Sequence, residues 1–293
     1  MNAGKDTPRP SDGSSRAAAG LGRARGPGYP FAMSGDSALL LQAVGELARL
    51  MGAAALRHYR PGIAVERKGD GSPVTIADRE AERAARAWLA AHFPRDAVLG
   101  EEFGPQPGAG GRTWLLDPID GTKTFVRGVP LWGSLVAVVE SDTVLAGAAA
   151  YPALGELLSA APGGGCWHDG ARCRVSDVAR LEAATVLTSD IERLTAADRR
   201  RGWQALADGA EMSRTWGDCW GYFLVATGRA EVMVDVGLNP WDVACFVPII
   251  EEAGGTISDF SGRRYPPLRD AIAVNGALTA EVGRLLGAGR EGG

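Results

Sequence analysis

Two carboxylates stand three positions apart in the run WLLDPIDGTK, which covers residues 114–123. Because Pro118 has a fixed φ and no N–H group, we expect an apolar strand to end there and the two acids, Asp117 and Asp120, to lie in a turn. As ordinary turn or helix-capping residues they would serve only local structure. Held so close, they would repel each other unless a cation lay between them. Carboxylates and main-chain carbonyls are the ligands that Mg²⁺ prefers, so the run predicts a metal site.

Small residues and further acids extend this site. Gly121 and Thr122 stand where a helix can begin, and free N–H groups at a helix start bind phosphate oxygens. Glu101 and Glu102 follow a short apolar stretch, and Asp242 begins another. We favour Glu101 as a ligand and expect Glu102 to be its exposed neighbour. The macrodipole of a helix start would stabilise an acid such as Asp242 without any metal.

Three acidic motifs occur in order: GEE at 100–102, DPIDGT at 117–122 and WD at 241–242, followed by an apolar helix and EAGG at 252–255. This set resembles the inositol monophosphatase superfamily of Mg²⁺-dependent phosphomonoesterases over about residues 36 to 290, and the ordered set is far more specific than any one motif. The resemblance implies an α+β fold, an αβαβα layered sandwich with mixed sheets. It also implies a homodimer that acts on a small-molecule phosphomonoester.

The resemblance further implies a role for each residue of the motifs. Roughly two or three Mg²⁺ ions would be bound by Glu101, Asp117, the Ile119 carbonyl, Asp120 and Asp242. Glu101 and Thr122, with Asp120, would be catalytic because they orient and activate the attacking water. The substrate phosphate would contact Asp120, Gly121, Thr122, Lys123 and Asp242. The cations would mask the repulsion between a phosphate dianion and the incoming water.

An upstream segment, SPVTIAD at residues 72–78, resembles another motif of the superfamily. Asp78 is implied there to bind a water in the outer sphere of Mg²⁺ or a third metal ion. Thr75 followed by Asp78 also has the spacing of a helix capping box, and the two roles are compatible.

A different segment, RTWGDCW at residues 214–220, bears on the substrate because it resembles the histidinol-phosphatase branch. Histidinol phosphate carries an ammonium and an imidazole, and a buried carboxylate such as Asp218 would pair with a cation. Arg214 would hold the phosphate or orient Asp218, and Asn275 would touch the imidazole. The alternative is that Arg214 and Asp218 form only a structural pair.

Two other functions stay open. Asp235 stands where inositol enzymes have an acid that contacts ring hydroxyls, which keeps inositol 1-phosphate or a broader set of sugar phosphates as alternative substrates. A catalytically silent metal-binding regulator is the alternative from another class. Loss of Glu101, Asp120 or Thr122 would be its sign, and all three are present.

Composition agrees with an enzyme of the cytoplasm. The chain has 293 residues, 45% of them hydrophobic, and a net charge of -4. Nucleic-acid binders usually carry a clustered basic excess, so we expect no nucleic-acid partner. We also expect no membrane segment, because no uninterrupted apolar run reaches about 18 residues. The four cysteines form no CxxC pair and are expected to be reduced.

The first 33 residues differ from the rest, because they are rich in Gly, Pro, Ser and Arg and have no apolar period. We expect a disordered leader over 1–33, with translation starting at Met1 or at Met33. A single phosphatase domain is expected over 34–293, with a metal-binding half to residue 180 and a substrate-specificity half from residue 181.

Apolar periodicity predicts the elements that must position these residues. We expect amphipathic helices over 36–59 and from Thr75 to His92. Apolar runs bounded by Gly, Pro or Asp predict strands over 113–117, 131–139, 144–150, 183–188, 230–235 and 271–275, and helices are expected over 195–208, 217–227 and 240–253. Pro248 should kink or break the last helix. This mixture is typical of a layered α+β fold.

Overall fold

The computed structural model describes Met1 and residues 35–60, 62–69, 71, 73–196, 199–264 and 268–287. The predicted leader, apart from Met1, and Ser72 of the upstream motif lie outside these ranges.

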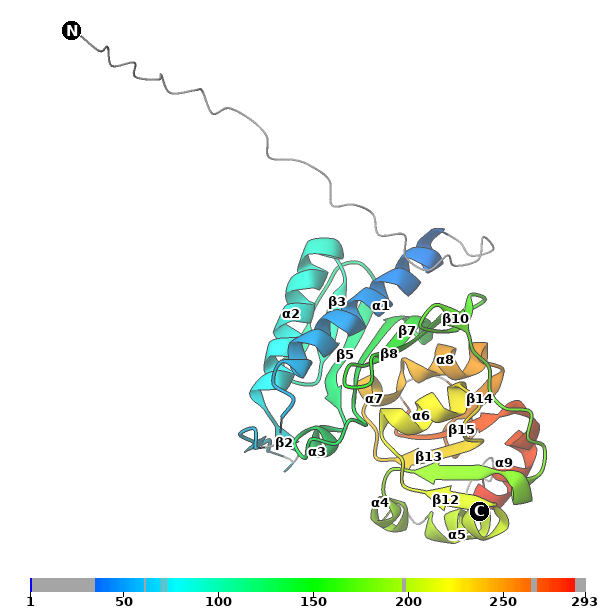
Figure 1. The fold of residues 1–293 in the computed structure, drawn as a ribbon. Coiled ribbons are helices and arrows are strands. Elements are labelled where there is room, and N and C mark those ends of the chain that lie inside the picture. Colours follow the sequence, from blue (N-terminus) through cyan, green and yellow to red (C-terminus); the bar gives the residue numbers. More distant parts are fainter. Residues whose placement is uncertain are drawn as a thin grey trace.

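A large, mostly antiparallel sheet forms one layer of the molecule (Figure 1). Its strand order is β10-β9-β8-β7-β6-β5-β3-β4. The bounds are β3 Ala97–Gly100, β4 Gly104–Gln106, β5 Arg112–Asp120, β6 Gly133–Glu140, β7 Thr143–Tyr151, β8 Glu156–Ala161, β9 Gly165–His168 and β10 Ala171–Arg172. A separate short pair, β1 Glu66–Arg67 and β2 Pro73–Val74, precedes it.

Two long helices cover the outer face of this sheet (Figure 1). The first, α1 (Gly35–Leu56), packs on β5 to β8 through buried side chains such as Leu40 and Val44. Among the described residues, α1 is the helix long and apolar enough to span a membrane by length and composition alone, and 61% of its most apolar window is buried inside the protein. The second, α2 (Ile76–His92), packs on α1.

A smaller mixed sheet forms a second β layer. Its strand order is β12-β11-β13-β15-β14; β11 runs parallel to β12 and to β13, and the other two pairs are antiparallel. The bounds are β11 Thr185–Thr188, β12 Met212–Arg214, β13 Val232–Val236, β14 Gly255–Ser258 and β15 Asp270–Asn275.

Helices fill the space between the sheets and cover the far side. The middle layer contains α6 (Cys219–Ala226), α7 (Pro240–Val243) and α8 (Phe246–Glu252), and α8 contacts strands of both sheets. The outer helices are α4 Ile191–Ala196, α5 Arg200–Gly209 and α9 Thr279–Leu286. Figure 1 therefore shows the order α, β, α, β, α, which confirms the predicted layered sandwich.

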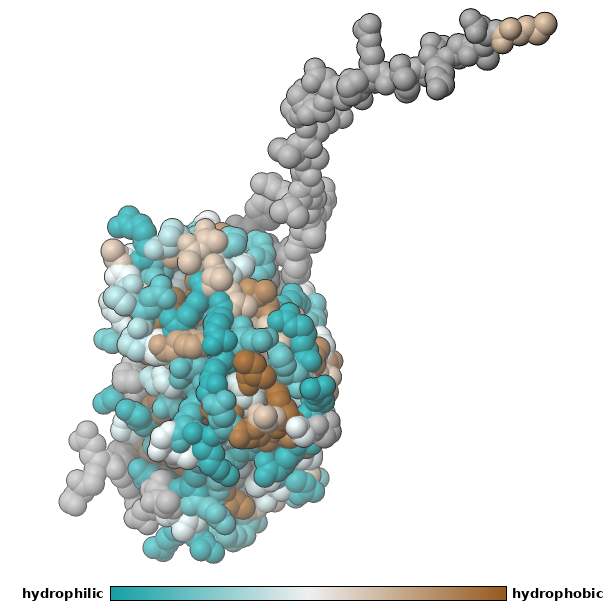
Figure 2. Space-filling view, turned by 90° about the vertical axis from the view of Figure 1, so that its left-hand side faces the viewer, coloured by the Kyte–Doolittle hydropathy of each residue, from teal (hydrophilic) through white to brown (hydrophobic). Residues whose placement is uncertain are grey.

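In the described part of the chain the core has three parts, which lie under α1 and α2, beneath the outer helices of the small sheet, and between the two sheets. The part between the sheets contains aromatic rings of α6: Phe223 stacks on Trp220 with centroids 4.4 Å apart and meets Tyr151 of β7 edge-on. The face seen in Figure 2 is mostly hydrophilic, with apolar side chains gathered near its centre.

The strand that carries the first acidic motif does not end at Pro118 as expected. It continues to Asp120, and its register with β6 shifts between Asp117 and Asp120. A proline is tolerated at such a bulge because the strand pairing needs no N–H group there. The Pro118 carbonyl accepts a hydrogen bond from Ser134 Oγ at 2.6 Å. The bulge aims both acids toward the middle layer.

The predicted helix over 240–253 is broken, as its proline required. The break falls at Ala244 and Cys245, between α7 and α8. Pro248 has no N–H to donate to the Ala244 carbonyl four residues earlier, so the first turn separates from the rest.

Candidate active site

Three acids meet where the large sheet faces the middle helices. Asp117 and Asp120 come from the bulged end of β5, and Asp242 comes from the first turn of α7. One carboxylate oxygen of each lies within 4.8 Å of the other two. We call these residues the acidic trio. Residues 122 positions apart in the sequence thus share one site.

The acidic trio is poorly neutralised by the side chains that the structure describes. Within the described part of the chain, no Lys or Arg forms an ion pair with any of the three. Burial and the charges of nearby carboxylates raise the pKa of Asp117 and Asp120 well above the usual range, and burial raises the pKa of Asp242 to about 7. Each accepts a backbone N–H, but carboxylates that are buried or half-buried and lack an ion pair are costly, so this donor set fits a divalent cation.

Glu101 stands beside the acidic trio, and its charge raises the pKa of Asp117. Lys68 holds it by donating to Glu101 Oε1 at 2.7 Å and to Glu102 Oε1 at 2.6 Å. Glu102 is not the exposed neighbour that we expected, because its side chain is only 4% exposed. Burial raises the pKa of Glu102 to about 7.

Asp78 takes the capping position that its spacing predicted. Its Oδ2 accepts from Thr75 N and from Thr75 Oγ1, each at 2.7 Å, at the start of α2. The side chain is buried, and burial followed by the charge of Glu101 raises its pKa to about 6. Asp78 therefore borders the same group of acids.

The residues after Asp120 form a tight turn into a short helix, α3 (Thr122–Phe125). Gly121 has φ 82°, which favours glycine, and a Cβ there would lie 3.3 Å from Asp218 Oδ2. Thr122 Oγ1 donates to the Ile119 carbonyl at 3.0 Å. Burial raises the pKa of Asp218, and the charge of the exposed Lys123 opposes part of that rise. The turn and Asp218 thus face each other.

Asp218 has a backbone conformation that is almost reserved for glycine, with φ 51° and ψ -154°. Its N–H donates to Ser189 Oγ at 2.7 Å, and the next N–H, that of Cys219, donates to Asp120 Oδ2 at 2.5 Å. Gly217 permits this close approach, because a Cβ there would lie 2.1 Å from Ser189 Cα. Such strain is typical of functional sites.

Asp235 lies close behind Asp218. It is buried at the end of β13, accepts from Ser189 Oγ at 2.8 Å, and burial raises its pKa to about 7. Burial raises the pKa of Asp218, Asp235 and Asp242, and the charge of Arg193 on α4 opposes part of that rise in all three.

Sequence analysis missed Ser189 and Arg193. Ser189 could have been found from its position directly after β11. Because β11 and β13 are parallel, Ser189 lies at the same end of the sheet as Asp235.

The structure does not bring Arg214 to the acids. This residue is exposed on the edge strand β12, donates to the Ser213 carbonyl at 2.8 Å and lies over the Trp216 ring at 5.9 Å. Among the described residues, Arg214 forms no ion pair with Asp218. The structure therefore does not show the structural Arg214–Asp218 pair that was the alternative.

Asn275 is also away from the site, which corrects the expectation of an imidazole contact. Its N–H donates to the Glu231 carbonyl, whereas Asp235 pairs with Ala271 at the other end of β13. The side chain is fully buried, and its amide donates to the Val178 carbonyl at 2.8 Å. Asn275 therefore has a structural role at the far edge of the sheet.

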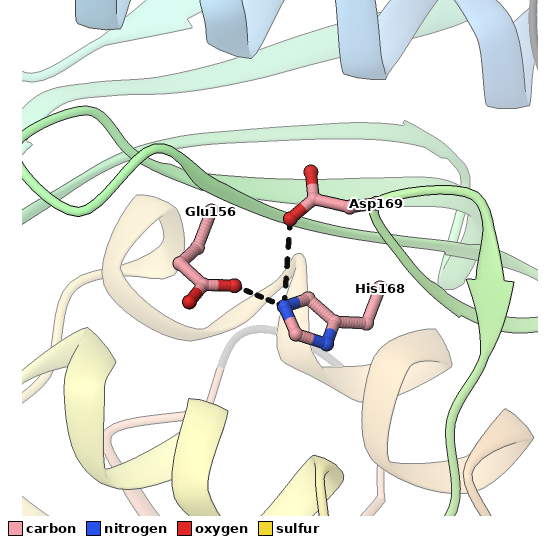
Figure 3. A group of neighbouring side chains, drawn as sticks. All are labelled: Glu156, His168 and Asp169. Atoms are coloured by element: carbon pink, nitrogen blue, oxygen red, sulfur yellow. Dashed lines mark hydrogen bonds and ion pairs between the residues drawn. The ribbon is translucent and has the colours of Figure 1, made fainter.

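A second group of metal-ligating types lies on β8 and β9 (Figure 3). Glu156 and Asp169 both point at Nε2 of His168, Asp169 from 3.5 Å. Arg49 also approaches Asp169 at 3.4 Å. Each of these carboxylates faces a cationic or protonatable partner, unlike the acidic trio.

Comparisons with known proteins agree with this geometry. The profile of the inositol monophosphatase family matches residues 36–288. The chain belongs to the inositol monophosphatase family. A histidinol-phosphatase of Chlorobaculum parvum is 43% identical over 76% of this chain and 87% of its own. One of Mycobacterium tuberculosis is 39% identical over 77% and 88%. The solved IMPase of Thermotoga maritima has a TM-score of 0.77 and 31% identity, covering 85% of this chain and 96% of its own.

Membership of the inositol monophosphatase family agrees with a metal-binding role for the acidic trio. Enzymes of this family are metal-dependent phosphatases, and the trio offers the hard oxygen ligands that such metals need. The second group in Figure 3 lies outside the three motifs that identify the family.

Proposed function

We propose that the protein is a Mg²⁺-dependent phosphomonoesterase that hydrolyses L-histidinol phosphate to L-histidinol and phosphate, a step of histidine biosynthesis. The observation that carries this proposal is the strained Asp218, whose carboxylate faces Gly121 beside the acidic trio. A strained, half-buried carboxylate beside a phosphatase site suits a cationic leaving group. The two relatives named histidinol-phosphatase support it.

The metal ligands in this proposal are the acidic trio together with Glu101 and the Ile119 carbonyl, and Asp78 would bind a water in the outer sphere of Mg²⁺ or a third ion. Bound there, Mg²⁺ supplies positive charge for the phosphoryl oxygens and makes water a better nucleophile. Carboxylate and carbonyl oxygens are the donors that Mg²⁺ prefers. Thr122 already donates to Ile119, which fixes the direction of that carbonyl.

Protein groups position the attacking water and the substrate phosphate. Glu101, held by Lys68 at 2.7 Å, accepts the proton of the attacking water, and the Thr122 hydroxyl oxygen orients that water. The phosphate oxygens accept hydrogen bonds from the N–H groups of Gly121 and Thr122 and from the Lys123 ammonium.

Asp218 and Asp235 face the leaving group in this proposal. Asp235 is buried and Asp218 is half-buried, and removal from water raises the pKa of both carboxyls. A bound ammonium or imidazolium would satisfy them electrostatically, whereas the hydroxyls of a neutral polyol would not neutralise their charge. The leaving group is therefore selected by charge.

Mg²⁺-dependent release of phosphate from histidinol phosphate tests the proposal. We expect full activity with Mg²⁺, loss of activity with EDTA and recovery when Mg²⁺ is added back. An intact, folded protein that releases no phosphate from any monoester would instead support the metal-binding regulator. Inositol 1-phosphate is the second candidate substrate, and the buried Asp235 favours it because an acid at that position contacts ring hydroxyls in inositol enzymes.

We also infer that the enzyme is a cytoplasmic homodimer that binds neither nucleic acid nor membrane. Its net charge of -4 supports the absence of a nucleic-acid partner. Light scattering coupled to gel filtration measures the subunit number directly.

A further inference from the structure

Two cysteines face each other across the β9–β10 hairpin. His168 pairs with Ala171 and Trp167 with Arg172, so Cys166 and Cys173 are the next opposed positions. Cys173 N donates to the Cys166 carbonyl at 3.1 Å, and the two sulfur atoms also lie 3.1 Å apart. Opposed residues of such a hydrogen-bonded pair have Cα atoms about 5.5 Å apart, which lies inside the range that a disulfide spans.

The two thiols differ in access. Cys166 is fully buried in the core between the sheets. Cys173 is partly exposed and lines a groove of about 410 Å³ together with Arg172 and Glu252. A small oxidant in this groove would therefore meet Cys173 first, with Cys166 in contact behind it.

The surroundings also favour reaction at Cys173. Its contact with Cys166, followed by the Arg172 charge, lowers the pKa of Cys173, whereas the same contact and burial raise the pKa of Cys166. The thiolate is the nucleophilic form of cysteine. Cys219 and Cys245 are both buried and have raised pKa values because of burial.

We propose that Cys166 and Cys173 form a reversible cross-strand disulfide when the protein meets hydrogen peroxide. The Cys173 thiolate attacks one peroxide oxygen, which breaks the O–O bond, releases water after protonation and leaves a sulfenic acid. The Cys166 sulfur then attacks the Cys173 sulfur, loses its proton and releases a second water. Two thiols are oxidised by two electrons, and one peroxide is reduced to two waters.

The partner thiol has a protective role. A sulfenic acid that finds no thiol is oxidised further to the irreversible sulfinic acid. Cys166 is already in contact with Cys173, so it captures the sulfenic acid first. Added dithiol returns both residues to thiols, and the cycle needs no contribution from the active site.

Intact-mass and peptide mass spectrometry of the full-length, Mg²⁺-loaded protein test this proposal after mild peroxide treatment. We expect a loss of two hydrogen masses, a linked peptide pair containing Cys166 and Cys173, and reversal by dithiothreitol. Alkylation of the unfolded protein should still label Cys219 and Cys245. Both hairpin cysteines remaining alkylatable, or a link to another cysteine, would overturn the proposal.

Two matched variants separate the roles of the two thiols. In Cys166→Ser, Cys173 should gain two oxygen masses as a sulfinic acid. In Cys173→Ser, Cys166 should stay a thiol because it is buried. If Cys166→Ser left Cys173 unoxidised, Cys173 would not be the reacting thiol. The wild-type result stands on its own if either variant folds poorly.

Discussion

Asp120 Oδ2 accepts a hydrogen bond from the backbone N–H of Cys219 at 2.5 Å. This contact joins the bulged end of β5 to the start of α6, and it exists because Asp218 adopts its glycine-like conformation one residue earlier. A proposed metal ligand and a proposed substrate-selecting residue are therefore coupled through one peptide group. Changes at Asp218 must be judged on stability and on catalysis separately.

Asp120→Asn should fold normally and lose at least about 10²-fold in kcat, because the site loses a charge that helps hold the cations that stabilise the transition state. Circular dichroism checks the fold and phosphate release measures kcat. Asp142→Asn, at the exposed tip of the β6–β7 hairpin, is the matched control and should keep full activity. An Asp120→Asn enzyme within a few-fold of wild type would refute the metal-ligand assignment.

Asp218→Gly should be more stable than Asp218→Ala by about 1 kcal/mol or more, since glycine adopts positive φ without strain and alanine does not. Urea unfolding of the two variants measures this difference. Both variants lack the carboxylate, so the comparison isolates the backbone. Equal stabilities would mean that the backbone of Asp218 is relaxed.

The metal-free protein should become less stable as pH rises. Burial raises the pKa of Asp235 and Asp242 from an ordinary 3.8 to about 7. Folding therefore favours their protonated forms, so their contribution is fully present below about pH 3.8 and is lost as pH rises through about 7. We expect the free energy of unfolding in EDTA to fall by on the order of a few kcal/mol between about pH 5 and about pH 8.

Urea titrations with and without Mg²⁺ check this dependence. Saturating Mg²⁺ should flatten it, because a bound cation stabilises the ionised carboxylates. Asp235→Asn should reduce the slope in EDTA. A stability that rises with pH in EDTA would contradict the burial of ionisable acids at this site.

A chain starting at Met33 should keep the melting temperature and activity of the full chain. Residues 1–33 are rich in Gly, Pro, Ser and Arg and carry too little apolar surface to pack. Thermal melts of both chains provide the comparison. A drop of more than a few degrees would show that the leader stabilises the domain.

Local patterns predicted many of the elements, but they did not predict β8, β9 or α9 or the long-range contacts of the site. The capping box of Thr75 and Asp78 and the layered sandwich are confirmed because periodicity and cap chemistry are short-range signals. Contacts between residues far apart in sequence leave no such signal. Cys219 lies 99 positions from Asp120, and Asp218 lies 29 from Ser189.

The same limit explains the corrections. Asn275 and Asp235 lie on neighbouring strands, but only the antiparallel register puts them at opposite ends. Glu102 is an acid next to an acid, and nothing local shows that Lys68 buries and pairs it. The position of Asn275 and the burial of Glu102 depend on tertiary packing, which local sequence patterns do not show.

kcat/KM for histidinol phosphate and inositol 1-phosphate, measured side by side on wild type and Asp218→Ala, tests most directly whether Asp218 selects a cationic leaving group. We expect wild type to prefer histidinol phosphate and Asp218→Ala to lose about 2 to 5 kcal/mol in kcat/KM on that substrate, because a charged ligand group loses its buried partner. Inositol 1-phosphate should change much less, because the substitution replaces no metal ligand and any shift of the Asp120 contact would affect both substrates alike. A wild type that prefers inositol 1-phosphate, or equal losses on both substrates, would contradict this account.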